Sequence, residues 1–234
     1  MKLLISVTSS VEAQAALKGG ADIVDVKNPA EGALGAAAVA ALRDIQVLLP
    51  PESVLSAALG ESNSAPGVLA LAAYGAARLG VHDVKLGLLT PVPTEAITLL
   101  QQVQSSLHLA NPECALIAVG YADAAEIGAL PWQLLPEVAH AARIKGCMID
   151  TALKDGRCLF DHCSEPALAR WLAQCREAGL LCALAGSLSH TDLPALRRLQ
   201  PDVAGFRGAA CRGDRVNGRV EAELVAALRA GLGD

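Results

Sequence analysis

The chain has 234 residues, of which 53% are hydrophobic and only 3% aromatic, and its formal net charge is −5. This length suits one large α/β domain, and an acidic balance without a basic tract argues against nucleic-acid binding. No apolar run reaches the roughly 20 residues that a membrane span needs. The seven cysteines form no CxxC or Cys/His pattern at zinc spacing, which predicts reduced thiols in a cytoplasmic protein.

Short apolar runs alternate with helical patterns along the chain. Residues 2–7 predict a first strand, because their apolar core is too short for a signal peptide. Ser9-Ser10 can cap a helix over 11–18, which Gly19-Gly20 can end. A second strand is predicted at 21–26, and the Ala-rich stretch 33–41 is interpreted as part of a helix that runs to residue 47. The later strands are predicted at 54–58, 83–86, 114–119, 147–149, 180–185 and 203–206, and the later helices at 67–79, 93–107, 134–144, 165–178, 191–199 and 221–230.

This alternation of eight apolar strands with helices indicates a single (β/α)8 TIM barrel domain over residues 1–234. Strands that are buried on both faces are continuous apolar runs, as these are. A doubly wound sheet is the alternative fold. It would require a glycine fingerprint after the first strand, and Thr8-Ser-Ser-Val-Glu12 is not one.

Charged residues lie at or just after the predicted carboxyl ends of the strands, where barrel enzymes place their active sites. In Asp25-Val-Lys27 the period of two puts both charged side chains on the same side of the strand. The spacing recurs in Asp83-Val-Lys85, and a lysine follows Asp150 by four residues. The catalytic candidates are therefore Asp25, Lys27, Lys85, Asp150 and Lys154.

A lysine with an apolar wall and other cations around it has a lowered pKa, so its neutral amine can attack a carbonyl and form a Schiff base. Asp25 or Asp150 can then shuttle protons between imine and enamine. One Asp-Lys pair alone would be interpreted as an ion pair that closes the barrel core. Three such pairs at strand ends favour catalysis. The histidines are scattered without a pairing that suits a metal, so we expect neither a metal nor a cofactor.

A phosphate site is predicted where the seventh and eighth strands end. Gly186-Ser187 follows the seventh strand and Arg207-Gly208 the eighth, and the loops in these places form a common phosphate site of barrels. Glycine lets backbone N–H groups approach an anion, and a guanidinium can add a bidentate contact. Asp123, after the fifth strand, joins the substrate-binding candidates.

Two further features stay open. Tyr121 can orient a substrate or simply pack. The arginines of the loop after the eighth strand can form a solvated surface, a second phosphate site or a subunit contact. These are Arg212, Arg215 and Arg219.

Six segments together resemble the (5-formylfuran-3-yl)methyl phosphate synthase family, also called 4-(hydroxymethyl)-2-furancarboxaldehyde-phosphate synthase. The resemblance runs from the first strand to the last helix. The segments are Asp25-Val-Lys27-Asn-Pro29 with Glu31-Gly-Ala-Leu-Gly35, Lys85-Leu-Gly87, Gly120-Tyr-Ala-Asp123, Asp150-Thr-Ala-Leu-Lys154-Asp-Gly156, Leu184-Ala-Gly-Ser187 and Arg207-Gly-Ala-Ala-Cys211.

This resemblance implies a (β/α)8 enzyme, similar to class I aldolases, that acts in methanofuran biosynthesis. It implies condensation of two glyceraldehyde 3-phosphate molecules, with loss of one phosphate and two waters, through a Schiff base on Lys27. The other active-site residues of the family match Asp25, Lys85, Asp150 and Lys154. It also implies a phosphorylated triose as the partner molecule, with no nucleic acid and no membrane, and we expect a homo-oligomer. A methanogen or a methylotroph would be the source.

Two other functions fit part of the pattern. Another class I phosphosugar aldolase or an isomerase would use the same strand ends, and an isomerase would form no imine. A non-catalytic phosphosugar-binding barrel would need the glycine-rich loops but not three buried lysines. The lysines favour the enzyme.

Overall fold

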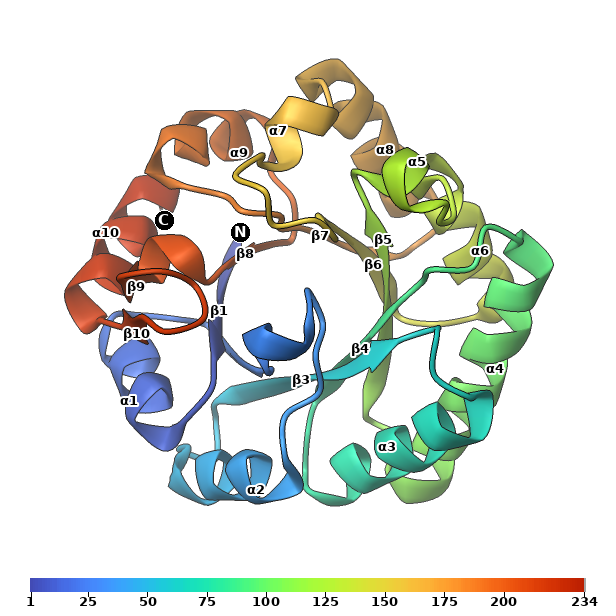
Figure 1. The fold of residues 1–234 in the computed structure, drawn as a ribbon, viewed down its shortest axis with the longest axis horizontal. Coiled ribbons are helices and arrows are strands. Elements are labelled where there is room, and N and C mark those ends of the chain that lie inside the picture. Colours follow the sequence, from blue (N-terminus) through green and yellow to red (C-terminus); the bar gives the residue numbers. More distant parts are fainter. Residues whose placement is uncertain (234) are drawn as a thin grey trace.

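Eight parallel strands close into a barrel in the computed structural model, which describes residues 1–233 (Figure 1). The eighth strand returns to the first, with Val203 opposite Lys2 in the register. This closure confirms the predicted (β/α)8 fold. The strands are β1 (Lys2–Val7), β2 (Ile23–Val26), β3 (Val54–Glu61), β4 (Asp83–Gly87), β5 (Ala115–Tyr121), β6 (Gly146–Asp150), β7 (Leu181–Leu184) and β8 (Val203–Phe206).

Helices surround the barrel as an outer ring (Figure 1). Ser9 caps the first of them, because its side chain accepts the backbone N–H of Glu12. Within residues 1–233, no helix combines the length and apolar character needed to cross a membrane. The helices are α1 (Ser10–Lys18), α2 (Val39–Leu48), α3 (Pro66–Arg78), α4 (Pro93–Ala110), α5 (Ala124–Ile127), α6 (Leu135–Ala142), α7 (Leu159–His162), α8 (Glu165–Glu177), α9 (Leu193–Leu199) and α10 (Ala222–Leu232).

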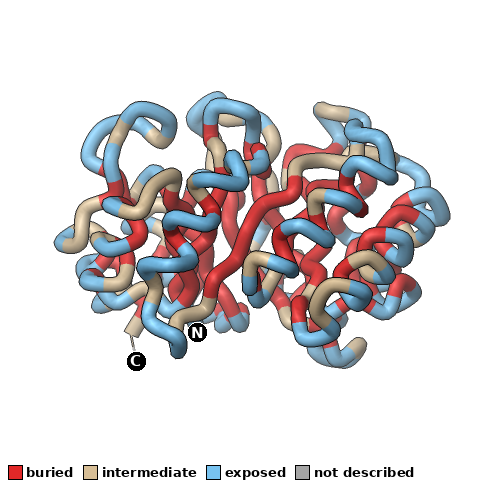
Figure 2. Tube along the Cα trace, turned by 90° about the horizontal axis from the view of Figure 1, so that it is seen from below, coloured by how far each residue is buried: buried red, intermediate tan, exposed pale blue. Residues whose placement is uncertain are grey.

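Alternation along the strands separates two cores. On β2, Val24 and Val26 point outward into the large core between strands and helices, whereas Ile23 belongs to a smaller cluster inside the barrel. The strands are buried along their length and exposure is concentrated on the outer helices and loops (Figure 2). By the same period of two, Asp25 shares the inward side with Ile23. The fold therefore delivers the charged residues of the strands to the inside of the barrel.

The prediction of helix over residues 33–38 is wrong, because α2 begins only at Val39. The segment from Pro29 onward instead lies across the barrel opening (Figure 1). Ala33 and Leu34 are buried there in the inner cluster, and the backbone N–H of Asn28 donates to the carbonyl of Gly35 at 2.8 Å. For Ala33 and Leu34, burial at the barrel opening outweighs helix propensity.

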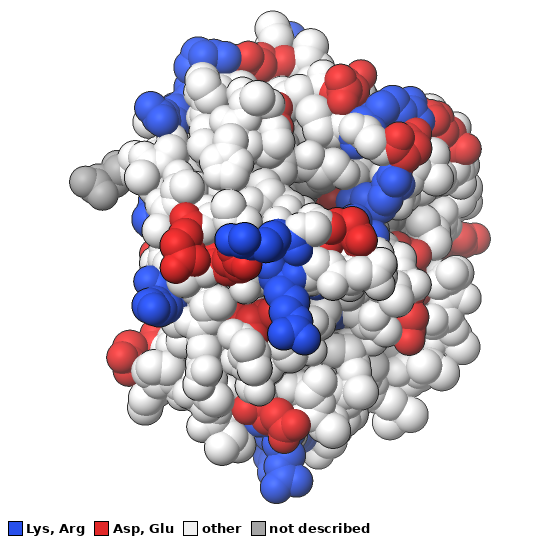
Figure 3. Space-filling view, turned by 60° about the vertical axis from the view of Figure 1, so that its left-hand side comes forward, with Lys and Arg blue, Asp and Glu red and all other residues white. Residues whose placement is uncertain are grey.

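A two-stranded hairpin after β8 was not predicted. It pairs β9 (Cys211–Arg212) with β10 (Arg219–Val220), and these strands are too short to give a sequence pattern. The face of the molecule shown in Figure 3 carries acidic and basic groups dispersed among larger uncharged areas. No extended basic surface lies on this face, in keeping with the net charge of −5.

Candidate active site

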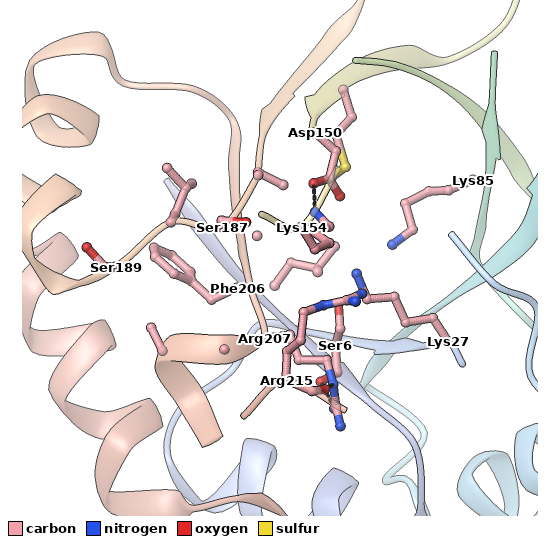
Figure 4. Close-up of a pocket in the computed structure, with 18 of the residues that line it drawn as sticks. Ser6, Lys27, Lys85, Asp150, Lys154, Ser187, Ser189, Phe206, Arg207 and Arg215 are labelled. Atoms are coloured by element: carbon pink, nitrogen blue, oxygen red, sulfur yellow. Dashed lines mark hydrogen bonds and ion pairs between the residues drawn. The ribbon is translucent and has the colours of Figure 1, made fainter. Parts of the chain in front are cut away.

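A cavity of about 310 Å³ opens at the carboxyl end of the barrel strands (Figure 4). It brings together eight of the ten predicted site residues, from five different strand ends. Asp25 and Asp123 are not part of the cavity wall that residues 1–233 form. The eight are Lys27, Lys85, Asp150, Lys154, Gly186, Ser187, Arg207 and Gly208.

Lys27 stands just past the end of β2 with 8% of its surface exposed. Its Nζ donates to the carbonyl oxygen of Ala33 at 3.2 Å, so the segment across the barrel opening holds the amine. Burial lowers the pKa of Lys27 to about 8, and the charges of Lys85 and Lys154 add to this against the opposing effect of Asp150 and Asp25. The result is an amine that is neutral far more often near physiological pH than an ordinary lysine is.

Asp25 pairs with Lys85 and not with Lys27. Its Oδ1 lies 2.5 Å from Lys85 Nζ, its carboxylate is fully buried, and Ser6 Oγ donates to Oδ2 at 2.8 Å. Burial alone would raise the pKa of Asp25, but the two lysine charges and these hydrogen bonds bring it below its usual range. The tilt and stagger of barrel strands explain the partner, because they bring Lys85 level with Asp25.

The expectation that three strands each end in an Asp-Lys pair is therefore only partly met. Asp83 begins β4, and it lines a separate cavity at the opposite end of the barrel with Lys2 and Lys145. Only Lys85 of that pair reaches the active-site cavity. In β2 both charged residues of the Asp-x-Lys pattern lie at the carboxyl end of the strand, whereas in β4 the aspartate lies at the opposite end of the barrel.

Asp150 ends β6 and pairs with Lys154 at 3.0 Å. Lys154 Nζ also donates to Thr151 Oγ1 at 2.9 Å, and the Thr151 backbone N–H donates to Asp150 Oδ1 at 2.7 Å. Burial would raise the pKa of Asp150, but the charges of Lys154 and Lys27 and these hydrogen bonds lower it to about 2. Asp150 is thus an anion at physiological pH.

Asp123 is bonded to the loop that leads to Lys154. Its two carboxylate oxygens accept the backbone N–H groups of Ala152 at 2.9 Å and Leu153 at 2.7 Å, in the loop that leads to Lys154. Only 2% of its surface is exposed. Asp123 does not line the cavity, and both of its carboxylate oxygens are bonded to this loop. Tyr121 is likewise buried, and it donates to Glu61 Oε1 at 2.8 Å.

The residues that follow β7 and β8 line the cavity. Gly186 has a φ of +106°, and a Cβ there would meet Thr151 at 3.1 Å, so glycine allows this turn. The next residue, Ser187, also has a positive φ of 50°. Within the described chain, the N–H groups of Ser187, Leu188, Gly208 and Ala209 have no hydrogen-bond partner. Four free donors around one space can bind a phosphate.

Arg207 lines the same cavity, but two of its three guanidinium nitrogens are hydrogen-bonded to other residues of the protein. Its Nη1 donates to the Ser6 carbonyl at 2.9 Å and to Glu12 Oε2 at 3.0 Å, and its Nε donates to the Arg215 carbonyl at 2.6 Å. Nη2 is buried without a partner in the structure. The bidentate phosphate contact predicted from sequence would therefore be reduced to this one nitrogen.

Glu12 and Ser6 were missed in the sequence analysis. Glu12 is 4% exposed. Burial raises the pKa of Glu12, but the charge of Arg207 and the hydrogen bonds from Arg207 and Thr8 together have the larger, opposite effect. The pKa therefore lies below its usual range. A carboxylate in the first turn of a helix is expected from the helix dipole, so nothing in the sequence singled out Glu12 as the partner of a buried arginine. Ser6 falls on the inward side of β1, and a polar residue there was the signal that could have indicated it.

We expect Arg207→Ala to lower the free energy of unfolding by about 3–5 kcal/mol, because it leaves Glu12 buried and unpaired. The matched control is Arg198→Ala, which breaks an exposed pair with Glu165 and should cost about 1 kcal/mol or less. Urea denaturation at pH 7 measures both. Equal losses in the two variants would show that the Glu12–Arg207 pair does not stabilise the fold.

The chain matches the family model described as 4-HFC-P synthase over residues 3–229. It is 40% identical to a (5-formylfuran-3-yl)methyl phosphate synthase of Methanocaldococcus jannaschii over 231 residues, which cover 98% of each chain. It is 41% identical to a protein of the same name from Methanopyrus kandleri over 233 residues, covering 99% of this chain and 98% of the other. These matches confirm the resemblance seen in the motifs.

Solved structures with the same fold are more distant in sequence. Phosphoribosyl anthranilate isomerase from Thermus thermophilus aligns with a TM-score of 0.68 at 17% identity, covering 99% of this chain and 98% of the other. A 3-hexulose-6-phosphate synthase from Salmonella typhimurium aligns with a TM-score of 0.66 at 15% identity, with the same coverage. Both likenesses concern the fold alone.

Proposed function

This chain belongs to the 4-HFC-P synthase family, and from that premise we propose that it joins two glyceraldehyde 3-phosphate molecules into (5-formylfuran-3-yl)methyl phosphate through an imine on Lys27. The reaction would supply the furan of methanofuran. The observation that carries the proposal is the buried Lys27 amine, whose pKa is lowered to about 8 and which lines the cavity. The same cavity is lined by residues with free backbone N–H groups that can bind a phosphate. We place the enzyme in the cytoplasm, where its seven free cysteines would stay reduced.

In the proposed mechanism the neutral Lys27 amine attacks the carbonyl carbon of one triose phosphate, and loss of water gives the imine. The protonated imine draws electrons from the neighbouring carbon, whose proton goes to a nearby base. Asp150 is an anion paired with Lys154, so this pair can carry protons between substrate oxygens and carbon. The resulting enamine attacks the aldehyde of the second triose and forms the new carbon–carbon bond.

One phosphate is retained in the product, and we assign it to the backbone donors after β7 and β8. The N–H groups of Ser187 and Gly208 belong to neighbouring loops and have no other partner in the described chain. A phosphate held there would keep the substrate carbonyl in the cavity with Lys27 (Figure 4). Positioning of this kind needs no movement of the catalytic lysine.

The rate of imine formation is expected to rise about tenfold per pH unit below pH 8 and to level off above it. At pH 7 roughly one Lys27 side chain in ten would be neutral, against roughly one in three thousand for an ordinary lysine. Borohydride trapping in single turnovers from pH 6 to pH 9 measures this rise in rate and the plateau that follows it. A profile that keeps rising toward pH 10 would show that burial does not lower the pKa of Lys27.

The proposed function is tested by incubating the purified protein with glyceraldehyde 3-phosphate. A furan aldehyde chromophore should appear together with one inorganic phosphate per furan. An isomerase would instead yield a ketose phosphate without a borohydride-trapped adduct, and a binding protein would return the substrate unchanged. Either of those results would replace the proposal.

A further inference from the structure

Arg215 lies in the turn of the β9–β10 hairpin and reaches into the active-site cavity (Figure 4). Its Nη1 donates to the carbonyl of Pro29 at 3.2 Å, and its Nη2 to that of Gly32 at 3.1 Å. Both carbonyls belong to the segment across the barrel opening that also holds Lys27 through Ala33. The hairpin thus places a half-buried guanidinium on the same segment that holds the Lys27 amine.

Arg215 lacks a close counterion among residues 1–233, and the more distant Asp150 is the carboxylate that acts on its charge. Arg207, its neighbour in the cavity wall, is neutralised by Glu12, whereas no carboxylate of residues 1–233 forms an ion pair with Arg215. Burial lowers the pKa of Arg215, although a guanidinium remains charged at any physiological pH. The two carbonyls use two of its five N–H donors, so three stay available for a ligand.

Two cations of the cavity have no ion-pair partner among residues 1–233. Lys85 is matched by Asp25, and Lys154 by Asp150. Lys27 and Arg215 remain, and Lys27 already has a role in the proposed chemistry. An unpaired guanidinium in a cavity is a site for a phosphate or a carboxylate.

We propose that Arg215 binds the second phosphate of the reaction, the one that is eliminated. This inference rests on the proposed function, in which two phosphates enter and one leaves. Arg215 and Ser187 lie at separate parts of the cavity wall in Figure 4, so two phosphates would not compete for the same donors. The retained phosphate takes the backbone N–H groups after β7 and β8, and the leaving phosphate takes the guanidinium.

The step that Arg215 would assist is a β-elimination. The proton on the carbon next to the imine or carbonyl carbon goes to a basic side chain of the site. The C–O bond to the phosphate on the following carbon breaks, its electron pair stays on the phosphate oxygen, and a carbon–carbon double bond forms in the remaining fragment. Negative charge grows on the departing phosphate, and a fixed guanidinium stabilises this charge most in the transition state.

The test compares Arg215→Gln with Arg215→Lys. Glutamine keeps one N–H donor group but has no charge, whereas lysine keeps the charge. Arg212→Gln is the matched control, because Arg212 is exposed on the same hairpin and pairs with Glu221. Phosphate release from glyceraldehyde 3-phosphate should fall by about 10²–10³-fold in Arg215→Gln, the scale for loss of one preorganised group that meets developing charge.

Arg215→Lys should retain much more of the rate than Arg215→Gln, and Arg212→Gln should match the unchanged protein. The adduct trapped on Lys27 in Arg215→Gln should still form and should keep its phosphate. Wild-type release in Arg215→Gln would overturn the proposal. Equal losses in the lysine and glutamine variants would also overturn it, because they would mean that Arg215 only ties the hairpin to the segment across the barrel opening.

A binding measurement separates failure of this inference from failure of the proposed function. Titration with inorganic phosphate should detect two sites per chain in the unchanged protein and in Arg212→Gln, and one in Arg215→Gln. If the unchanged protein makes no furan aldehyde, the proposed reaction is wrong, but the titration still decides whether Arg215 binds phosphate. Two sites in Arg215→Gln would refute the assignment, whatever the reaction.

Discussion

Lys27→Met is expected to abolish both the borohydride-trapped adduct and the furan aldehyde product. The loss of rate should be on the order of 10⁶-fold, the scale seen when a covalent nucleophile is removed. Methionine replaces an amine whose charged form is disfavoured by burial, so the free energy of unfolding at pH 7 should not fall. Peptide mapping by mass spectrometry after reduction measures the adduct, and urea denaturation checks the fold.

Lys18→Met is the control for this experiment, because Lys18 is exposed at the end of α1, outside the cavity. It should leave both the adduct and the product unchanged. An adduct that persists in Lys27→Met and maps to Lys85 or Lys154 would assign the nucleophile to one of those residues. The geometry would then have to be reinterpreted with Lys27 as the cation that lowers its neighbour's pKa.

Lys85→Met is expected to have two separate effects. It leaves Asp25 fully buried without its ion-pair partner, so the free energy of unfolding should fall by about 3–5 kcal/mol. It also removes a positive charge that lowers the pKa of Lys27, so the pH at which imine formation levels off should move above 8. Urea denaturation measures the first effect, and trapping at several pH values the second.

The double variant Asp25→Asn with Lys85→Met separates stability from catalysis. Replacing both partners removes the uncompensated buried charge, so most of the lost stability should return. Activity should stay low, because the cation beside Lys27 is still missing. A double variant no more stable than Lys85→Met would show that the ion pair is not the reason for the loss.

Much of the fold could be predicted from local patterns. Each strand is a run of apolar residues that is buried on both faces, and this run is visible whatever the strand pairs with. Ser9 before α1 and Gly19 after it act within one turn of the helix, so their effect is also local. The predicted third and fifth strands end too early, because polar residues extend β3 to Glu61 and β5 to Tyr121.

The sequence by itself determined that Lys27 and Asp150 stand at the carboxyl ends of strands, since each follows an apolar run, and it placed Lys85 within the fourth strand. It did not determine their partners. Asp25 pairs with Lys85 because the strands of a closed barrel are tilted and staggered, a property of the whole sheet.

The same limit explains the other differences. Glu12 meets Arg207 across 195 residues, and Arg215 meets Gly32 across 183. Residues 33–38 are rich in alanine and would suit a helix, but Ala33 to Gly35 are buried at the barrel opening and α2 begins only at Val39. Propensity and periodicity act over a few residues, whereas contacts between distant segments exist only once the barrel has closed. The tertiary structure alone therefore decided which charges are neutralised and which, like those of Lys27 and Arg215, have no ion-pair partner among residues 1–233.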